Sequence, residues 1–324
     1  MKTADYEAIF KQTQTELAET VYNELKKYYP TDYIKKTDSY IYAIGNIPIA
    51  LIAHLDTVWE KNPPQFIFHD SEKGVMWNPY GLGADDRAGV IAILNILAQG
   101  YVPHVIFTHD EEIGGLGAEE LAANGNPFPE LKYIIELDRK GSEDCVFYEC
   151  ENKDFQKYVE SFGFKTAIGT FSDISYICPT WNVCGVNLSI GYYNEHSATE
   201  MFFPELMQRT ILKVINMLCD KKIPHFKWIG SKVFSVIKSN AKNFETKNQK
   251  GTKVCCNCQK SFAPDEILRV NGANGGTKYY CLDCGEKNLA FCIRCGNVYE
   301  DNRGINHTGF CPNCYESMED YYVF

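Results

Sequence analysis

Short apolar runs alternate along this sequence with longer segments whose apolar residues recur at helical spacing. The runs IPIALIAHLD, VPHVIFTHDEE and KYIIELD predict strands that are buried on both faces. The segments RAGVIAILNILAQG, GLGAEELAANG, ENKDFQKYVESFG and PELMQRTILKVINML predict helices. Alternating strands and helices indicate an α/β fold with a mostly parallel, mixed sheet that helices cover on both faces.

Other segments add smaller elements to this scheme. Residues 4 to 29 have apolar positions at helical spacing and end before Pro30, so we expect one amphipathic helix there. A hairpin is expected through QFIFHDSEKGVMW, and further strands in CVFYEC and VCGVNLSIGYY.

Length and composition limit the class of protein. With 324 residues, 45% of them hydrophobic, the chain can form one domain with a large core and a small second unit. It lacks the roughly 18 to 20 uninterrupted apolar residues of a membrane helix, and its start has no secretory apolar run. We therefore expect a cytoplasmic protein with no membrane partner. The net charge of -10 disfavours a general nucleic-acid binder.

Histidines and acids stand where the predicted strands end. AHLD ends the first buried strand, HDEE the second and ELD the third, while NEHS follows the last strand. In a parallel α/β sheet, groups at the carboxyl ends of strands converge on one crevice. A chain that used acids only for solubility would scatter them over helix surfaces, so this placement indicates a ligand or metal site.

The residue types at these positions suit a metal centre. His54 and Asp56 lie on the same face of a strand, and a carboxylate beside a metal-binding imidazole often accepts its second ring N–H. The adjacent acids Glu111 and Glu112 diverge, so one can bind metal while the other acts as a base. An aspartate after the glycine turn of GADD can bridge two cations. With Asp138 and His196 the set suits zinc and, less specifically, cobalt or manganese.

The motifs AHLDT, GADDRAG, DEEIGGLGAEE, ELD and EHSATE, in this order, resemble the co-catalytic di-zinc peptidases. That group includes leucyl-type aminopeptidases, tetrahedral aminopeptidases, and the carboxypeptidase G and aminoacylase relatives. The resemblance implies a phosphorylase/hydrolase-like peptidase domain with two catalytic zinc ions. It also implies hydrolysis of a peptide or amide substrate by a water that the two metals activate.

Position by position, the resemblance assigns a role to each motif residue. Asp85 becomes the carboxylate that bridges the two zinc ions, because Asp85-Asp86-Arg87-Ala88-Gly89 fits the frame of the family motif. Glu111 becomes the general base, and Asp56 orients the first histidine. The remaining implied zinc ligands are Glu112 and His196 at one site, and His54 and Asp138 at the other.

The spacing of these residues departs from some relatives. Only 57 residues separate Asp138 from His196, too few for the lid domain of the carboxypeptidase and aminoacylase relatives. Only 30 separate His54 from Asp85, too few for the domain that tetrahedral aminopeptidases insert there. The missing lid favours an aminopeptidase. Two alternatives remain: an N-acyl amino acid or other amide hydrolase, and an inactive scaffold whose C-terminal tail binds a protein or nucleic-acid partner.

Asp173 allows two interpretations. It lies in GTFSDISYI, which resembles a substrate-side loop of some relatives. Ser172 and Asp173 also precede an apolar run, and both residue types are common helix N-caps.

Nine of the 14 cysteines fall in the last 70 residues, and eight of these form Cys-x-x-Cys pairs. Two such pairs together supply four thiolates, enough for one closed tetrahedral zinc site. The four pairs therefore predict two structural zinc ions. Sequential pairing of the four pairs is preferred to an arrangement in which the first and third share a metal. The eight predicted ligands are Cys255, Cys258, Cys281, Cys284, Cys292, Cys295, Cys311 and Cys314.

These features divide the chain into three parts. Residues 1–220 are predicted to be the catalytic domain, 221–254 a lysine-rich connector, and 255–324 a pair of zinc knuckles. Few basic or aromatic residues surround the knuckles, so a protein partner is favoured over nucleic acid. The five cysteines of the main body, Cys145, Cys150, Cys178, Cys184 and Cys219, are interpreted as small core residues.

Overall fold

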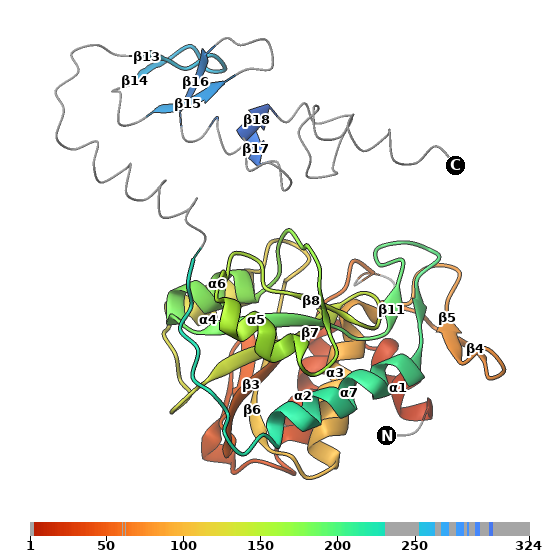
Figure 1. Cartoon of the computed structure of the whole chain (residues 1–324). Helices are drawn as coiled ribbons and strands as arrows, with labels where there is room; N and C mark the ends of the chain where they lie inside the picture. Colours follow the sequence, from red (N-terminus) through yellow and green to blue (C-terminus); the bar gives the residue numbers. More distant parts are fainter. Residues whose placement is uncertain are drawn as a thin grey trace, which may run out of the picture. The chain divides into compact units, whose positions relative to one another are not determined.

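The computed structural model describes residues 3–59, 61, 63–230, 253–262, 267–271, 277–281, 284, 289–291 and 298–300. The chain divides into two compact units, Met1–Gly230 and Ser231–Phe324 (Figure 1). Residues 221–230, expected at the start of the connector, form part of the first unit. There Phe226 is buried, Lys227 pairs with Val183, and Gly230 pairs with Cys150.

The first unit is built on an eight-stranded mixed sheet. Its strand order is β1 (Ile34–Lys36), β2 (Tyr40–Ala43), β6 (Pro103–Thr108), β3 (Ile47–His54), β7 (Tyr133–Arg139), β10 (Cys184–Ser189), β8 (Asp144–Val146) and β9 (Lys165–Thr166). The four central strands β6, β3, β7 and β10 are parallel to one another. Antiparallel pairs flank them at β1–β2, β2–β6 and β10–β8. The expected mixed α/β fold is therefore confirmed.

Helices cover both faces of this sheet, as the alternation along β3 requires. Ile49 and Leu51 pack with residues of α1 (Thr3–Phe10), α2 (Gln14–Leu25), α3 (Ala84–Ala98), α5 (Lys153–Glu160) and α7 (Pro204–Leu218). Ala50 and Ile52 point to the other face and pack with α4 (Leu116–Ala123) and α6 (Ile174–Trp181). Figure 1 shows α4 and α6 on one side of the strands and α2, α3 and α7 on the other. Apolar contact on both faces explains why the central strands lack a polar face.

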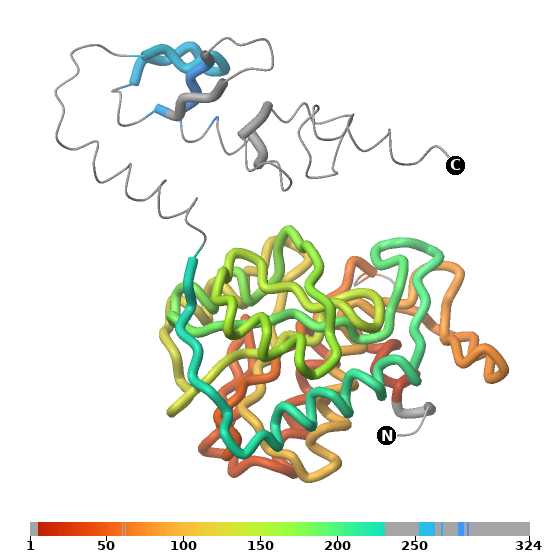
Figure 2. Tube along the Cα trace, in the orientation of Figure 1, coloured from red at the N-terminus to blue at the C-terminus, as the bar shows by residue number. Residues whose placement is uncertain are grey.

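A smaller antiparallel sheet stands beside the main one. It contains β11 (Tyr192–Tyr193), β12 (Met201–Phe202), β5 (Val75–Trp77) and β4 (Phe68–Asp70) in this order. The expected hairpin is confirmed as β4–β5. Phe202 of β12 packs on Tyr6 and Phe10 of α1, so these distant segments lie side by side (Figure 2).

The single helix expected over residues 4 to 29 is wrong. Two helices form instead, and α2 begins with a capping box in which the Thr13 side chain accepts from the Glu16 backbone N–H. The Glu16 carboxylate accepts in return from the Thr13 backbone N–H at 2.9 Å. Arg87 of α3 also donates to the Gln12 carbonyl at 2.9 Å. Local capping therefore outweighs a helical pattern that is continuous in sequence.

The second unit contains three two-stranded antiparallel sheets among its described residues. They are β13 (Lys253–Val254) with β14 (Ser261–Phe262), β15 (Ile267–Asn271) with β16 (Thr277–Cys281), and β17 (Leu289–Phe291) with β18 (Val298–Glu300). Among the described residues of the whole chain, no helix has the length and apolar character needed to cross a membrane.

Four of the five cysteines of the first unit are buried as expected, namely Cys145, Cys150, Cys178 and Cys184. The interpretation of Cys219 as a core residue is wrong, because its side chain is exposed. It follows the last residue of α7, where the helix ends at the surface.

Candidate metal centre

The carboxyl ends of the central strands bring the polar motif residues together. His54 is the last residue of β3, Asp138 lies near the end of β7, and Glu111 and Glu112 follow β6. His196 comes from the loop that joins β11 to β12. Because β3, β6 and β7 are parallel, their ends lie at one edge of the sheet, as the sequence predicts.

His54 is the buried centre of one group. Its Nδ1 atom lies 3.1 Å from Oδ1 of Asp56. Its Nε2 atom points the other way, 3.3 Å from Oδ1 of Asp85 and 3.7 Å from Oδ1 of Asp138. The imidazole is thus oriented by one carboxylate and presents its second nitrogen to two others, the arrangement expected of a metal-binding histidine.

His196 forms a second group with the opposite side of Asp85. Its Nε2 atom lies 3.1 Å from Oδ2 of Asp85 and 2.9 Å from Oε1 of Glu112. In each group the three donor atoms lie within 4.8 Å of one another, so each group can hold a metal ion. Both groups contain Asp85, which contributes a different oxygen to each histidine.

Asp86 belongs to neither group, although it adjoins Asp85 through a cis peptide bond. Its carboxylate accepts the backbone N–H of Gly89 at 2.9 Å and that of His54 at 3.2 Å. A Cβ atom at Gly89 would lie 2.6 Å from this carboxylate, so the DDRAG motif needs a glycine there. Asp86 therefore connects the start of α3 to the end of β3.

Asp56 also fixes the two adjacent glutamates. Its carboxylate accepts the backbone N–H groups of Glu111 at 3.1 Å and Glu112 at 2.9 Å. The preceding residue, Asp110, is held by Gln14 at the start of α2 through two hydrogen bonds of 3.1 and 3.0 Å. Helix α2 and Asp56 together determine where the Glu111–Glu112 backbone lies.

Several contacts around Asp138 were not foreseen from the sequence. Ser172 Oγ donates to Oδ2 of Asp138 at 3.0 Å, and the Tyr192 hydroxyl donates to Oδ1 at 3.1 Å. The Asp138 backbone N–H donates to Asn187. Only the capping signal at Ser172–Asp173 marked this region in the sequence, because the partners come from separate elements.

Asp173 precedes α6, but its side chain makes no capping hydrogen bond. It is buried and contacts the Thr108 hydroxyl instead, while its other oxygen has no hydrogen-bond partner. The side-chain capping interpretation is therefore wrong for Asp173.

The acids around the two histidines of the first unit favour a positive charge there. Burial opposes protonation of His54, but Asp56, Asp85 and Asp138 outweigh it and raise the pKa of its imidazole well above the ordinary value. Hydrogen bonds with Asp85 and Glu112 raise the pKa of His196 to about 10. Acids that favour an imidazolium ion also favour a bound metal cation, so the donor set fits a metal.

The pKa values of the carboxyl groups in this cluster shift in different directions. Burial and the neighbouring acids Asp85 and Asp86 raise the pKa of Asp138 well above its usual range. Burial, together with Asp173 and Glu112, raises the pKa of Glu111 to about 8. Burial opposes ionisation of Asp56 too, but His54 and two backbone N–H groups lower its pKa to about 2.

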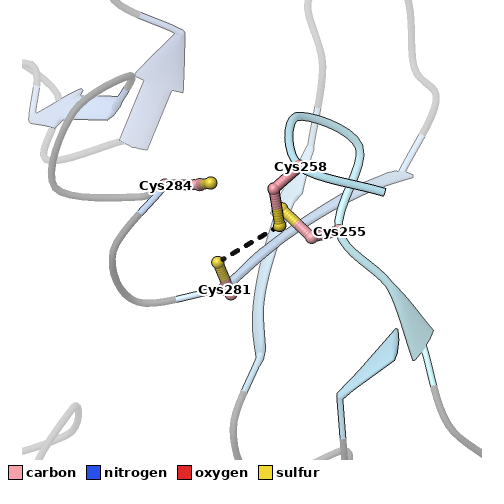
Figure 3. A group of neighbouring side chains, drawn as sticks. All are labelled: Cys255, Cys258, Cys281 and Cys284. Atoms are coloured by element: carbon pink, nitrogen blue, oxygen red, sulfur yellow. Dashed lines mark hydrogen bonds between the residues drawn. The ribbon is translucent and has the colours of Figure 1, made fainter. Parts of the chain in front are cut away.

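The second unit holds a separate candidate metal site. The Sγ atoms of Cys255, Cys258, Cys281 and Cys284 all lie within 4.8 Å of one another. Figure 3 shows the four side chains directed toward a common centre. The Sγ atoms of Cys258 and Cys281 lie 3.9 Å apart. The first and second Cys-x-x-Cys pairs thus meet, as in the sequential arrangement. The other predicted ligands, Cys292, Cys295, Cys311 and Cys314, lie outside the described residues.

Solved structures of two aminopeptidases have a similar fold. A TET aminopeptidase from a marine sediment Thaumarchaeota archaeon aligns with a TM-score of 0.54 and 13% identity, over 68% of this chain and 98% of that one. Aminopeptidase PepT from Bacillus cereus aligns with a TM-score of 0.51 and 13% identity, over 65% and 95%. At these identities the likeness concerns the fold. No curated protein matches the sequence.

Residues 50–263 match the sequence profile of Peptidase family M20/M25/M40. With the two ligand groups at the edge of the sheet, this match defines a hydrolase of the metallopeptidase class. The chain belongs to peptidase family M20/M25/M40. Members of this family generally bind metal ions, usually zinc.

Proposed function

We propose that the first unit is a di-zinc aminopeptidase that removes the N-terminal residue from peptides. The observation that carries the proposal is the sharing of Asp85 between two groups of candidate ligands. Asp85, Glu112 and His196 would hold one zinc ion, and His54, Asp85 and Asp138 the other. When bound, the two ions supply Lewis-acid polarisation of the scissile carbonyl and make a water molecule more acidic.

Glu111 is the proposed general base. Its backbone is fixed by Asp56, its side chain is mostly buried, and it belongs to neither ligand group. Bound metal cations would offset the burial and the acids that raise its pKa, so Glu111 would be ionised and free to take a proton from the attacking water and to deliver it to the amine that leaves. Asp56 orients His54 and also holds the backbone of Glu111, so it fixes the proposed base relative to a proposed metal ligand.

The layout of the first unit supports an aminopeptidase over a deacylase. The described residues between His54 and Asp85 form the β4–β5 hairpin and its flanking loops. Those between Asp138 and His196 form β8, α5, β9, α6, β10 and β11, most of which belong to the main sheet or cover it. Neither described interval contains an inserted domain that would cover the metal centre.

A matched pair of peptides tests this proposal. The zinc-loaded protein is incubated with a set of short peptides and with the same peptides acetylated at the N-terminus. We expect release of single N-terminal residues from the free-amine forms only. Release of acetate or of acetylated residues, with the free-amine peptides intact, would support the amide hydrolase alternative and contradict the aminopeptidase.

We also propose that the four clustered cysteines of the second unit bind a structural zinc ion. Four thiolates in a closed set are typical of such sites, and a unit this small gains much of its folding free energy from the metal. The role proposed for this unit is to hold a protein partner, a second subunit or the peptide substrate, with nucleic acid as the alternative.

A further inference from the structure

Glu200 is a buried carboxylate that none of the proposed catalytic roles uses. It lies in the loop between β11 and β12, four residues after His196, and its residue surface is 1% exposed. A carboxylate so completely removed from water must have its oxygens hydrogen-bonded, because burial of an unpaired charge is costly.

Three of the four N–H donors to Glu200 come from the segment that carries Asp85. One oxygen, Oε2, accepts the backbone N–H of Gly83 at 2.7 Å and that of Leu82 at 3.1 Å. It also faces the indole N–H of Trp59 at 3.3 Å. The other oxygen, Oε1, accepts the backbone N–H of Asp85 itself at 3.0 Å.

These contacts hold the turn that leads into α3. Asp85 and Asp86 have non-helical backbone angles, so the regular part of α3 begins after Asp86, whose side chain accepts the Gly89 N–H. Glu200 supplies the acceptors for the backbone N–H groups of this turn from more than a hundred residues away. The backbone position of Asp85 therefore depends on the loop that carries His196.

His196 depends on the same connection. Its side chain is 49% exposed, whereas that of His54 is 2% exposed, so packing holds His196 much less firmly. The loop around it is braced by the Ser197 hydroxyl, which donates to the Asn194 carbonyl at 2.7 Å. Glu200 joins this braced loop to the start of α3.

We infer that Glu200 is a positioning residue that fixes His196 relative to Asp85 and thereby strengthens the binding of one of the two metals more than that of the other. The metal affected more is the one that Asp85, Glu112 and His196 would hold. The other group also contains Asp85, but its remaining members, His54 and Asp138, are buried on the main sheet and make no hydrogen bond with Glu200, so it should be affected less. The inference rests on the metal binding of the proposed function, but not on the identity of the substrate.

The test compares the full-length wild type with Glu200→Gln and Glu200→Ala. In Glu200→Gln an amide N–H₂ replaces one acceptor oxygen and meets N–H donors at nearly the same volume. Each metal-depleted protein is titrated with cobalt(II) and followed by its visible absorption. Thiolate charge-transfer bands report the cysteine site, while the weaker bands of oxygen and nitrogen ligands report the first unit.

Asn152→Ala is the matched control. The Asn152 side chain is also buried and caps a helix, accepting the backbone N–H groups of Asp154 at 3.1 Å and Phe155 at 3.0 Å. Its substitution likewise removes a buried side-chain acceptor of backbone N–H groups, and the residues that donate to it are not candidate ligands. A general loss of stability would thus appear in both variants, whereas a change in one metal site would appear only at Glu200.

We expect Glu200→Gln to bind one of the two metals of the first unit about 10- to 100-fold more weakly, as removal of groups behind metal ligands generally does. The other metal, which shares only Asp85 with this group, should weaken less, and the cysteine site should bind as in the wild type. In Asn152→Ala every site should keep its affinity while the melting temperature falls.

Unchanged binding of both metals by Glu200→Gln would overturn the inference, and so would equal weakening of both. These results would leave the proposed function intact. A wild-type first unit that binds no metal would overturn the proposed function and this inference together. Should Glu200→Ala fail to fold, Trp59→Phe provides the graded case, because it removes only one of the four donors and should weaken the same metal less than Glu200→Gln.

Discussion

At the scale of single residues, neighbouring acids have separate tasks because their side chains leave the backbone in different directions. Asp85 faces His54 and His196, whereas Asp86 faces the backbone N–H groups of His54 and Gly89. Glu112 contacts His196, while Glu111 stays outside both ligand groups. In each of these pairs, one residue is a proposed metal ligand, and the other has a structural role or transfers a proton.

The two aspartates should respond differently to truncation. Asp86→Ala leaves two buried N–H groups without an acceptor, so we expect the metal-depleted protein to lose about 1–3 kcal/mol per lost contact. Asp85→Ala should lose metal binding with a smaller effect on the metal-depleted protein. Urea unfolding after chelator treatment and metal counting by mass spectrometry check both. A normal metal content in Asp85→Ala would contradict the shared role of this residue.

Adjacent sequence motifs allowed the candidate ligands to be predicted, but not the residues that hold them. His54, Asp85, Glu112, Asp138 and His196 were identified by their order and by the strands they follow. Glu200, Ser172 and Tyr192 act through hydrogen bonds to residues 34 to 141 positions away. Nothing in a single sequence indicates such contacts, since they arise only when the sheet order and the loop paths are known.

At the scale of elements, apolar periodicity predicted the buried strands and most helices, because hydrophobic burial decides their faces. It failed where local polar contacts decide, as at Thr13, which starts a new helix within an apparently continuous one. The strands β1 and β2 were also not foreseen. They lie at the antiparallel edge of the sheet, where the residues IKK and YIYA lack the long apolar run of the central strands.

Strand β6 carries a pH-dependent contribution to stability. His104 is buried near its start, stacks on Phe128 and accepts the Gly45 backbone N–H at 3.1 Å. Burial lowers its pKa from 6.5 to about 4. Between these values the unfolded chain binds a proton that the folded protein excludes, so the stability contributed by neutral His104 decreases as the pH falls.

His104→Gln removes this titration and retains an acceptor for Gly45. We expect its free energy of unfolding to fall less steeply than that of the wild type as the pH drops from 6.5 to about 4. The difference in slope corresponds to at most about one proton taken up on unfolding. Urea unfolding followed by far-ultraviolet circular dichroism reports on the helices of the first unit. Parallel pH profiles for the two proteins would show that His104 does not titrate on unfolding.

At the scale of the whole molecule, two units with different sources of stability share one chain. The first has a large apolar core on both faces of its sheet. The described core of the second is small and consists largely of its cysteines with Tyr280. The first unit should therefore keep its structure when metals are removed, whereas the second should depend on its metal.

Cysteine substitutions test this dependence with a control in the same unit. Cys281→Ser removes a thiolate from the cluster, while Cys256→Ser changes an exposed cysteine outside it. We expect Cys281→Ser, and chelator treatment of the wild type, to expose residues 253–281 to protease and to lower the zinc content by one ion. Cys256→Ser should resist protease as the wild type does. Equal resistance of Cys281→Ser would contradict a structural zinc ion.

The central claim is that two metals and Glu111 together hydrolyse the N-terminal peptide bond. Its most direct test is mass spectrometry of a mixed peptide library incubated with the zinc-loaded wild type and with zinc-loaded Glu111→Gln. The variant should retain both metals of the first unit, because Glu111 lies outside both ligand groups. We expect stepwise N-terminal trimming by the wild type and a rate about 10²- to 10⁴-fold lower for the variant. No trimming by a wild type that holds both metals, or equal trimming by the two proteins, would contradict this account.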